Sequence, residues 1–254
     1  MQVGGLRIDN TGSKNPIVSV VCVTLNAAHQ LPNLINSVAE KKNNDVEFIV
    51  IDGSSTDGTV EILAGNQHVI DFWISEPDAG IYDAMNKSLN YVNGQWMIFL
   101  GADDELCEGF AEAIALLKNN HTIYYGNVNF YGKIFTKIYD DYYLTKLNIC
   151  HQSIFYPTSV FSKYKFNLRY KVYADYELNL RCWKDQTFKF QHVDQLVASF
   201  RDGGYSSFTK DDAFEMDRDM LFKKYLKLTS YLRYLNRTLG FWNALKFCFD
   251  KQLS

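Results

Sequence analysis

The chain has 254 residues, of which 47% are hydrophobic and 22% charged, and it carries a formal net charge of −3 at pH 7. This composition supports a sizeable hydrophobic core and argues against wholesale disorder. The near-neutral charge argues against a general nucleic-acid-binding protein, which carries a strong basic excess. The five cysteines are widely spaced without a CxxC pair, which argues against a disulfide framework or a zinc site and favours a reducing cytoplasm.

Sequence signals for export or membrane insertion were also considered. The first 16 residues lack the apolar core of a signal peptide. No run of 18 apolar residues occurs, so we expect no membrane span.

The first half of the chain alternates between strand-like and helix-like segments. After a lead-in at 1–15 that we expect to be flexible, apolar runs predict buried strands at 17–25, 46–52, 68–75 and 95–104. Periodic apolar residues between these runs predict helices. Such alternation is typical of right-handed βαβ units, so we predict an α/β fold with a mainly parallel sheet.

The second half is less regular. Alternating patterns predict strands at 122–132, 133–143, 150–157, 187–193 and 195–200, and a helix at 173–183. From residue 209 the pattern is helical to the chain end, with a break near Gly240.

These patterns divide the chain into a domain at 16–220 and a tail at 221–254. Within the domain we expect a nucleotide-binding half at 16–105 and an acceptor half at 106–220. The tail differs in charge, because it carries +6 whereas the first 220 residues carry −9. It mixes bases with Leu and aromatic residues, and such a basic amphipathic helix can lie on an anionic membrane surface. A helix packed on the body, or a contact in a homodimer, would show the same pattern.

Polar side chains follow each strand of the first half. Thr24 and Asn26 follow the first strand, Asp52 ends the second, residues 76–80 follow the third and residues 101–104 follow the fourth. Ligands of parallel sheets bind beyond the carboxyl ends of the strands, so we expect these residues to line a ligand site.

The adjacent acids Asp103 and Asp104 come directly after an apolar strand. Adjacent carboxylates repel each other, and a hard divalent cation such as Mg²⁺ or Mn²⁺ relieves that repulsion while bridging to substrate phosphates. A solvated loop or a helix N-cap is the alternative for such a pair in isolation.

Asp52 leads into the loop GSSTDGT. A short acid here can accept hydrogen bonds from a ribose or a base edge, or it can close an Asx-turn. The loop lacks the GK[ST] ending of a P-loop, and GxGxxG is absent from the sequence, which weakens a nicotinamide dinucleotide interpretation.

Four ordered motifs, VVCVTLN, VIDGSSTDGT, SEPDAGIYDAMNKSL and GQWMIFLGADD, together resemble family 2 glycosyltransferases of the GT-A fold. The similarity is to bacterial enzymes that build surface polysaccharides, including colanic-acid-type transferases. The similarity is strong over residues 17–120, and weaker similarities extend as far as Ser206. The resemblance implies a Rossmann-like mixed, mainly parallel sheet flanked by helices, here with a C-terminal helical extension.

The resemblance also implies roles for the residues at the strand ends. Thr24 and Asn26 lie where the first strand of the family meets the nucleotide base, and Asp52 matches the acid that contacts the base or its ribose. Gly80 lies where the chain passes close to the nucleotide sugar. Nearby polar candidates are Asp78, Asp83 and Lys87.

Asp103 and Asp104 match the DXD element of the family, although this chain reads ADD. The match implies that Asp104 binds the divalent metal, Mn²⁺ or Mg²⁺, directly. Asp103 would lie nearer the ribose and share the metal site.

A transferase also needs a base that deprotonates the acceptor hydroxyl. Asp175 matches the position of that carboxylate in the family, and we expect a helix N-terminus to hold it in place and ionised. One base with in-line attack implies inversion at the sugar carbon. The alternative role for Asp175 is a helix N-cap only.

Two further segments resemble the family more weakly. His151 and Gln152 form an HQ pair, in which His151 would contact the diphosphate, the metal or the donor sugar. Gly204 and Ser206 belong to a GG-x-S element that could act as a lid. A structural His and an ordinary turn are the alternatives.

The resemblance therefore implies transfer of a sugar from a nucleotide sugar to a glycan acceptor in bacterial O-antigen, capsule or exopolysaccharide synthesis. A UDP-sugar is the default donor, and GDP- or dTDP-sugars stay open. We expect a polyprenyl-diphosphate-linked acceptor, and a cytoplasmic protein that contacts the inner face of the plasma membrane through its tail.

Three other classes were weighed. A glycoside hydrolase with two carboxylates would leave the strand-end residues unexplained. A non-catalytic glycan- or nucleotide-binding protein could lose Asp175 or the Asp pair, and all three are present. A nucleotidyltransferase usually needs a basic, Gly-rich phosphate loop, which VTLNAAHQLP does not supply.

Overall fold

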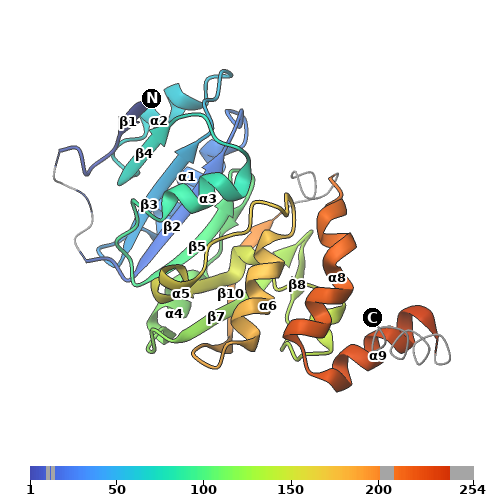
Figure 1. The fold of residues 1–254 in the computed structure, drawn as a ribbon. Helices are drawn as coiled ribbons and strands as arrows, with labels where there is room; N and C mark the ends of the chain where they lie inside the picture. Colours follow the sequence, from blue (N-terminus) through green and yellow to red (C-terminus); the bar gives the residue numbers. More distant parts are fainter. Residues whose placement is uncertain (10–11, 13–14, 201–208, 241–254) are drawn as a thin grey trace.

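The computed structural model of the protein describes residues 1–9, 12, 15–200 and 209–240. Its centre is a ten-stranded sheet with the order β1-β4-β3-β2-β5-β9-β7-β10-β6, and β8 pairs with β7 off this path. Helices cover both faces of the sheet (Figure 1). The predicted α/β fold is therefore confirmed.

The strands of the first half run mainly in parallel. They are β1 (Gln2–Gly4), β2 (Val18–Thr24), β3 (Val46–Asp52), β4 (Phe72–Ser75), β5 (Trp96–Gly101) and β6 (Glu105–Leu106). β2 pairs in parallel with β3 and β5, and β3 pairs in parallel with β4. The register sets Thr24 opposite Asp52, and Asp52 opposite Ser75. The polar residues after these strands consequently meet at one end of the sheet.

Both faces of β2 and β3 are buried, which explains their continuous apolar sequence. One face packs against α1 (Leu31–Lys41), α2 (Thr59–Gly65) and α4 (Gly109–Leu116). The other face packs against α3 (Ile81–Ser88), α5 (Thr158–Lys163), α6 (Ala174–Lys184), α8 (Asp212–Tyr225) and α9 (Leu228–Leu239).

The second half continues the same sheet through β7 (Thr122–Phe130), β8 (Lys133–Phe135), β9 (Ile154–Pro157) and β10 (Lys189–Phe200). β9 pairs antiparallel with both β5 and β7 and so joins the two halves. The two strands predicted at 187–193 and 195–200 are the single strand β10. Its pairing with β7 shifts register between His192 and Leu196, where the sequence suggested a junction.

Two predicted strands of the second half are shorter than expected. Of residues 133–143, Lys133–Phe135 forms β8, and the segment ends at the 3₁₀-helix η1 (Tyr143–Thr145). The segment predicted at 150–157 begins with a second 3₁₀-helix, η2 (His151–Ser153), before β9. This turn carries the HQ pair.

The beginning of the chain corrects the expectation of a flexible lead-in. β1 pairs antiparallel with β4, and a Cβ on Gly4 would lie 2.5 Å from the Trp73 ring. The Arg7 side chain forms an ion pair with Glu47, which is fully buried. An edge strand of three residues leaves no periodic signal, so the sequence pattern did not reveal it.

The C-terminal helices correct the boundary at residue 221, because α8 runs through it. Leu221, Phe222 and Leu226 are buried in the main core. The helix breaks at Leu226, where the backbone turns extended, and the N–H of Lys227 donates to Asp141 Oδ1 (2.9 Å). The predicted break near Gly240 is confirmed as the end of α9, where Gly240 has a φ of 77°.

Candidate active site

Two loops that follow β2 and β3 are tied together at one end of the sheet. Asn26 Oδ1 accepts a hydrogen bond from the backbone N of Thr56 (2.9 Å), and the N–H of Asn26 donates to Ser55 Oγ (2.7 Å). The N–H of Ala28 donates to Asp57 Oδ2 (3.0 Å). Asn26 has a φ of 51°, a left-handed conformation that Asn tolerates better than most residues. Asn26 is exposed and shapes the loop at the predicted base position.

Asp52 lies beneath these loops and is fully buried. Its carboxylate accepts hydrogen bonds from the N–H and hydroxyl of Ser55 and from Ser75 Oγ (2.6 Å). The Asp52 carboxylate therefore holds this loop, and its contact with a base or ribose stays a prediction. Thr24 is also buried, and among the described residues its Oγ1 has no hydrogen-bond partner.

The loop after β4 contains the next group of predicted residues. Asp78 Oδ1 accepts from the N–H of Gly80 (2.8 Å), and Asp83 Oδ2 accepts from the N–H of Ala79 (3.0 Å). Lys87 Nζ lies 3.4 Å from Asp83 Oδ2 and donates to the carbonyl of Pro77. Gly80 has a φ of 119°, and a Cβ built there meets nothing within 4 Å. These polar side chains shape an open loop at the start of α3.

This loop packs closely on the loop after β3. A Cβ on Gly53 would lie 2.5 Å from Asp78 Oδ2, so Gly53 is required for the close approach of the two loops.

Asp103 and Asp104 follow β5. Asp104 is 3% exposed, and its Oδ2 accepts from the N–H of Gly101 (2.6 Å). Burial, followed by the charge of Asp103, raises the pKa of Asp104 to about 8. Asp103 is half-buried, and its Oδ1 folds back over Gly101. The charge of Asp103 lies close enough to oppose ionisation of Asp104, which a cation would relieve.

Asp175 is the second residue of α6 and is 6% exposed. It is not an N-cap, because Tyr173 occupies that position and makes no side-chain cap. Tyr82 OH donates to Oδ1 (2.8 Å) and Asn148 Nδ2 donates to Oδ2 (2.7 Å). Burial raises the pKa of Asp175, while His151, Tyr82 and Asn148 lower it. Burial and the partners of this carboxyl thus act on its pKa in opposite directions, and burial is the larger effect.

The η2 turn joins the acidic pair to Asp175. His151 Nδ1 lies 3.8 Å from Asp175 Oδ2, and Gln152 Nε2 lies 3.5 Å from Asp104 Oδ1. Burial lowers the pKa of His151, although Asp175 and Asp103 act in the opposite direction. Two consecutive residues thus bring together acids that are 71 positions apart in the sequence.

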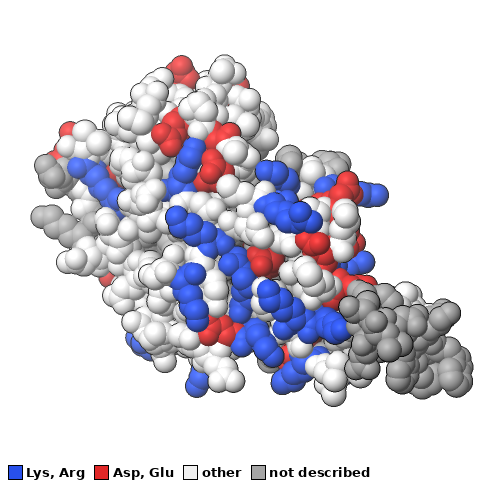
Figure 2. Space-filling model, viewed as in Figure 1, with Lys and Arg blue, Asp and Glu red and all other residues white. Residues whose placement is uncertain are grey.

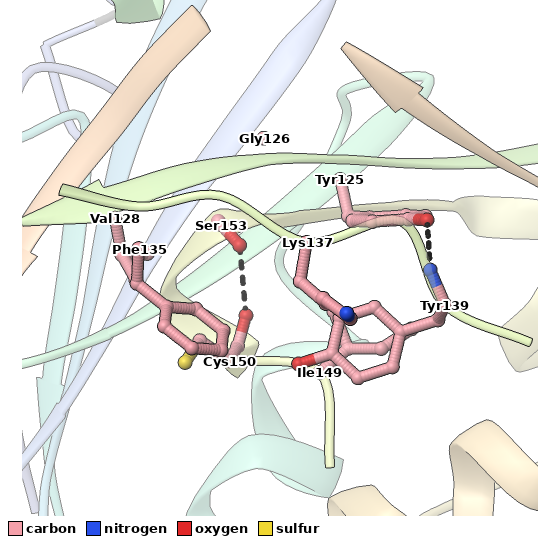
Figure 3. A pocket seen from close by; sticks show the side chains of 9 residues that line it. All are labelled: Tyr125, Gly126, Val128, Phe135, Lys137, Tyr139, Ile149, Cys150 and Ser153. Atoms are coloured by element: carbon pink, nitrogen blue, oxygen red, sulfur yellow. Dashed lines mark hydrogen bonds between the residues drawn. The ribbon is translucent and has the colours of Figure 1, made fainter. Parts of the chain in front are cut away.

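A small pocket opens beside this turn, on the side of β7 and β8 (Figure 3). It encloses about 200 Å³ of space that is continuous with solvent. Tyr139 and Tyr125 form its aromatic wall, and the N–H of Tyr139 donates to Tyr125 Oη (3.1 Å). The other lining residues are Gly126, Val128, Phe135, Lys137, Ile149, Cys150 and Ser153.

Sequence reasoning did not select Tyr82 or Asn148, although both hold the Asp175 carboxylate. Tyr82 lies next to Asp83 on the predicted helix, and Asn148 lies shortly before the HQ pair. Neither position has a motif that distinguishes it from an ordinary core or loop residue. Gly204 and Ser206, the predicted lid residues, lie outside the described residues.

Solved structures with this architecture are glycosyltransferases. The chain matches Staphylococcus aureus TarS 1-349 in complex with UDP-GlcNAc at a TM-score of 0.67 and 16% identity, over 89% of this chain and 72% of that one. It spans 43% of a longer TarS chain. The mannosyltransferase PcManGT from Pyrobaculum calidifontis, in complex with GDP-Man and Mn²⁺, matches at a TM-score of 0.60 and 13% identity, over 95% and 81% of the two chains. These likenesses show that the chain has the fold of these glycosyltransferase structures.

The family model "Glycosyl transferase family 2" matches residues 19–213, and the chain belongs to this family. A PGL/p-HBAD biosynthesis glycosyltransferase of Mycobacterium tuberculosis is 36% identical over 217 residues, which are 78% of this chain and 82% of that protein. The putative teichuronic acid biosynthesis glycosyltransferase TuaG of Bacillus subtilis is 32% identical over 93 residues, which are 35% and 37% of the two chains.

Proposed function

We propose that this family 2 glycosyltransferase transfers a sugar, with inversion, from a nucleotide sugar to a lipid-linked glycan acceptor in bacterial surface-glycan synthesis. The observation that carries the proposal is the η2 turn, whose side chains contact Asp175 and Asp104. The turn sets a buried carboxylate suited to accept a proton beside an acidic pair suited to a divalent cation.

Several observations support a nucleotide-sugar donor at the ends of β2–β5. The solved structures with the same fold contain UDP-GlcNAc and GDP-Man. Among the residues that the structure describes, Thr24 Oγ1 is buried without a partner at that end of the sheet, and the loops around it are held in place by hydrogen bonds. We favour a UDP-sugar, and GDP- and dTDP-sugars are tested alongside it.

Asp103 and Asp104 fit a divalent cation by the chemistry of their oxygen ligands. Burial and the charge of Asp103 raise the pKa of Asp104, so a nearby cation would favour the ionised form of this carboxyl. Among the described residues, no group of three His, Cys, Asp or Glu side chains could hold a metal by itself. Two carboxylates suit Mg²⁺ or Mn²⁺ when substrate phosphates supply further oxygens. Such an ion, when bound, would neutralise charge that develops on the departing diphosphate.

The chemistry of the protein's own side chains starts at Asp175. Asp175 accepts the proton of the acceptor hydroxyl as the hydroxyl oxygen forms a bond to the anomeric carbon. The bond from that carbon to the diphosphate breaks, and its electron pair leaves with the nucleoside diphosphate. Attack opposite the leaving group inverts the configuration. His151 lies beside Asp175, where a largely neutral ring can hydrogen-bond to the acceptor or the diphosphate.

The surface of α8 and α9 supports an acceptor on a lipid surface. Leu228 is 64% and Leu232 40% exposed on α9. Lys223 and Lys224 are exposed at the end of α8, and Figure 2 shows Lys and Arg side chains gathered over the region of α6 and α8. Exposed leucines and basic side chains on adjoining helices suit an anionic bilayer at the inner face of the plasma membrane. Every helix in the described part of the chain is too short or too polar to cross a bilayer.

The test is calorimetric titration of the protein with UDP, GDP and dTDP, with and without Mn²⁺. We expect one nucleotide to bind in a metal-dependent manner, and Asp104→Ala to weaken that binding at least about tenfold. A matched control is Asp185→Ala, which removes a surface acid paired with Lys163. Equal binding by wild type and Asp104→Ala would contradict the metal assignment, and failure of all three nucleotides to bind would contradict the donor assignment.

A further inference from the structure

Behind Asp175 lies a buried row of polar side chains that leads away from the reacting atoms. Asn148 Nδ2 donates to Asp175 Oδ2 (2.7 Å), Asn179 Nδ2 donates to Asn148 Oδ1 (2.9 Å), and Tyr156 OH donates to Asn179 Oδ1 (2.7 Å). The row connects the segment before η2 with α6 and β9. Its members come from three separate parts of the sequence and meet only in the folded chain.

The row has a direction, and chemistry dictates it. An ionised carboxylate only accepts hydrogen bonds, so Asn148 must turn its amide nitrogen toward Asp175. Its oxygen then faces Asn179, which must present its own nitrogen, and the Asn179 oxygen is left to accept from Tyr156. Tyr156 and Asn179 are fully buried, so a reversed amide would leave polar groups unpaired, at a substantial cost in stability. Each donor in the row therefore points toward Asp175.

Two other contacts bear on how Asp175 and Asn148 are held. Tyr82 OH, which donates to Asp175 Oδ1, also lies 2.6 Å from the carbonyl of Val172 and has one proton for both. Tyr139 OH donates to the backbone carbonyl of Asn148 (2.8 Å) and holds that residue from the other side. Asn179 lies one helical turn after Asp175, so both side chains face Asn148.

We propose that Tyr156, Asn179 and Asn148 are positioning residues whose one-way row of donors keeps Asp175 the proton acceptor and directs its open lone pair toward the acceptor hydroxyl. The inference rests on the proposed role of Asp175 as the base. Aligned hydrogen bonds polarise one another, so the terminal Tyr156 acts on Asp175 through both amides. The row opposes the effect of burial, which by itself favours the protonated carboxyl.

Other groups that face Asp175 enter any pH dependence as well. They are Tyr82 on α3, Cys150 and His151 at the η2 turn, Tyr156 on β9, and Tyr173 and Tyr176 on α6. Of these, His151 has the ordinary pKa closest to neutral pH, and burial lowers it. A shift produced by the row must therefore persist when Tyr156→Phe is made in a His151→Gln background, whereas a shift that comes from His151 must disappear there.

The mild test is Tyr156→Phe, which removes the last donor and little volume. We expect kcat to fall about fivefold with KM for the donor unchanged, and the acidic limb of the kcat–pH profile to move to higher pH. The matched control is Tyr176→Phe, which removes a buried hydroxyl of α6 whose bond goes to the Leu144 carbonyl and not to the row. We expect Tyr176→Phe to lower thermal stability to a similar extent and to leave the pH profile in place.

The stronger test is Asn179→Asp, a change of one atom that reverses the row. An ionised Asp at 179 accepts from the amide nitrogen of Asn148, which turns the Asn148 oxygen toward Asp175. We expect kcat to fall about a hundredfold, again with an upward shift of the acidic limb.

Comparison of these variants with Asp175→Asn separates the proposed role of the row from the proposed role of Asp175 as the base. If Asp175→Asn is inactive but Tyr156→Phe behaves like Tyr176→Phe, the row is structural only and the inference is overturned while the base assignment stands. If Asp175→Asn keeps most of its activity, the base assignment fails and the inference fails with it. A lower Tm for Tyr156→Phe without a shifted pH profile counts against the row, and a shifted profile supports it even if Asn179→Asp does not fold.

Discussion

The two sides of the candidate site are built differently. At the ends of β2–β5, the hydrogen bonds run within one loop, such as Asp78 with the N–H of Gly80, or between the loops after neighbouring strands, such as Asn26 with the N–H of Thr56. Around Asp175, the partners come from both halves of the chain: Tyr82 is 93 positions away and Asn148 is 27. The donor side is therefore encoded mainly in contiguous motifs, whereas the side of the proposed base exists only after the helices have packed.

The largest expected effect is on the base side. Asp175→Asn keeps the size of the side chain but removes the proton acceptor, so we expect kcat to fall about 10³-fold. Nucleotide binding, measured by calorimetry, should stay within about twofold of wild type, because Asp175 lies outside the donor loops. An Asp175→Asn enzyme with nearly normal kcat would show that another group takes the proton.

The next effect tests how the donor side is anchored. Arg7→Ala leaves the fully buried Glu47 without its charged partner, so we expect a loss of about 3 kcal/mol in the free energy of unfolding, measured in urea. Lys163→Ala breaks the surface pair with Asp185 and should change stability little. Similar losses in the two variants would mean that the buried pair contributes no more than a surface pair.

A smaller effect concerns the exposed surface of α9, which we propose contacts a lipid bilayer on the acceptor side. Leu228→Asp places a charge where α9 presents an exposed Leu, so binding to anionic vesicles should fall about tenfold in a sedimentation assay. Leu116→Asp is the control, because Leu116 is 44% exposed on α4, which packs on the other face of the sheet. Equal losses for both variants, or none for either, would remove this face from the membrane proposal.

The smallest effect sharpens the picture of the donor side. Gly53→Ala forces Asp78 away by steric contact, so we expect about a threefold loss of nucleotide affinity by calorimetry. Gly65→Ala, at the end of α2, adds a methyl group to open space and should leave the affinity unchanged. Unchanged affinity in Gly53→Ala would mean that the Asp78 loop moves without affecting the nucleotide.

The sequence pattern anticipated much of the donor side and less of the base side. Continuous apolar runs located β2 and β3, and the polar residues at their ends lie together as expected because parallel strands end on one edge. The pattern did not anticipate β1, the break at Leu226 or the burial of Asp52. These features depend on contacts between distant segments, for which a local pattern carries no signal.

The sequence by itself determined the α/β class, the family and the identity of the acids that carry the proposed chemistry. Periodic apolar residues and ordered motifs are local properties of the sequence, so they can be recognised before the packing of the chain is known. Only the tertiary structure decided that His151 and Gln152 join Asp175 to Asp104, and that Tyr156, Asn179 and Asn148 line up behind the base. The physical reason is that a buried polar group must find its partner in space, and the folded core selects that partner regardless of its distance along the sequence.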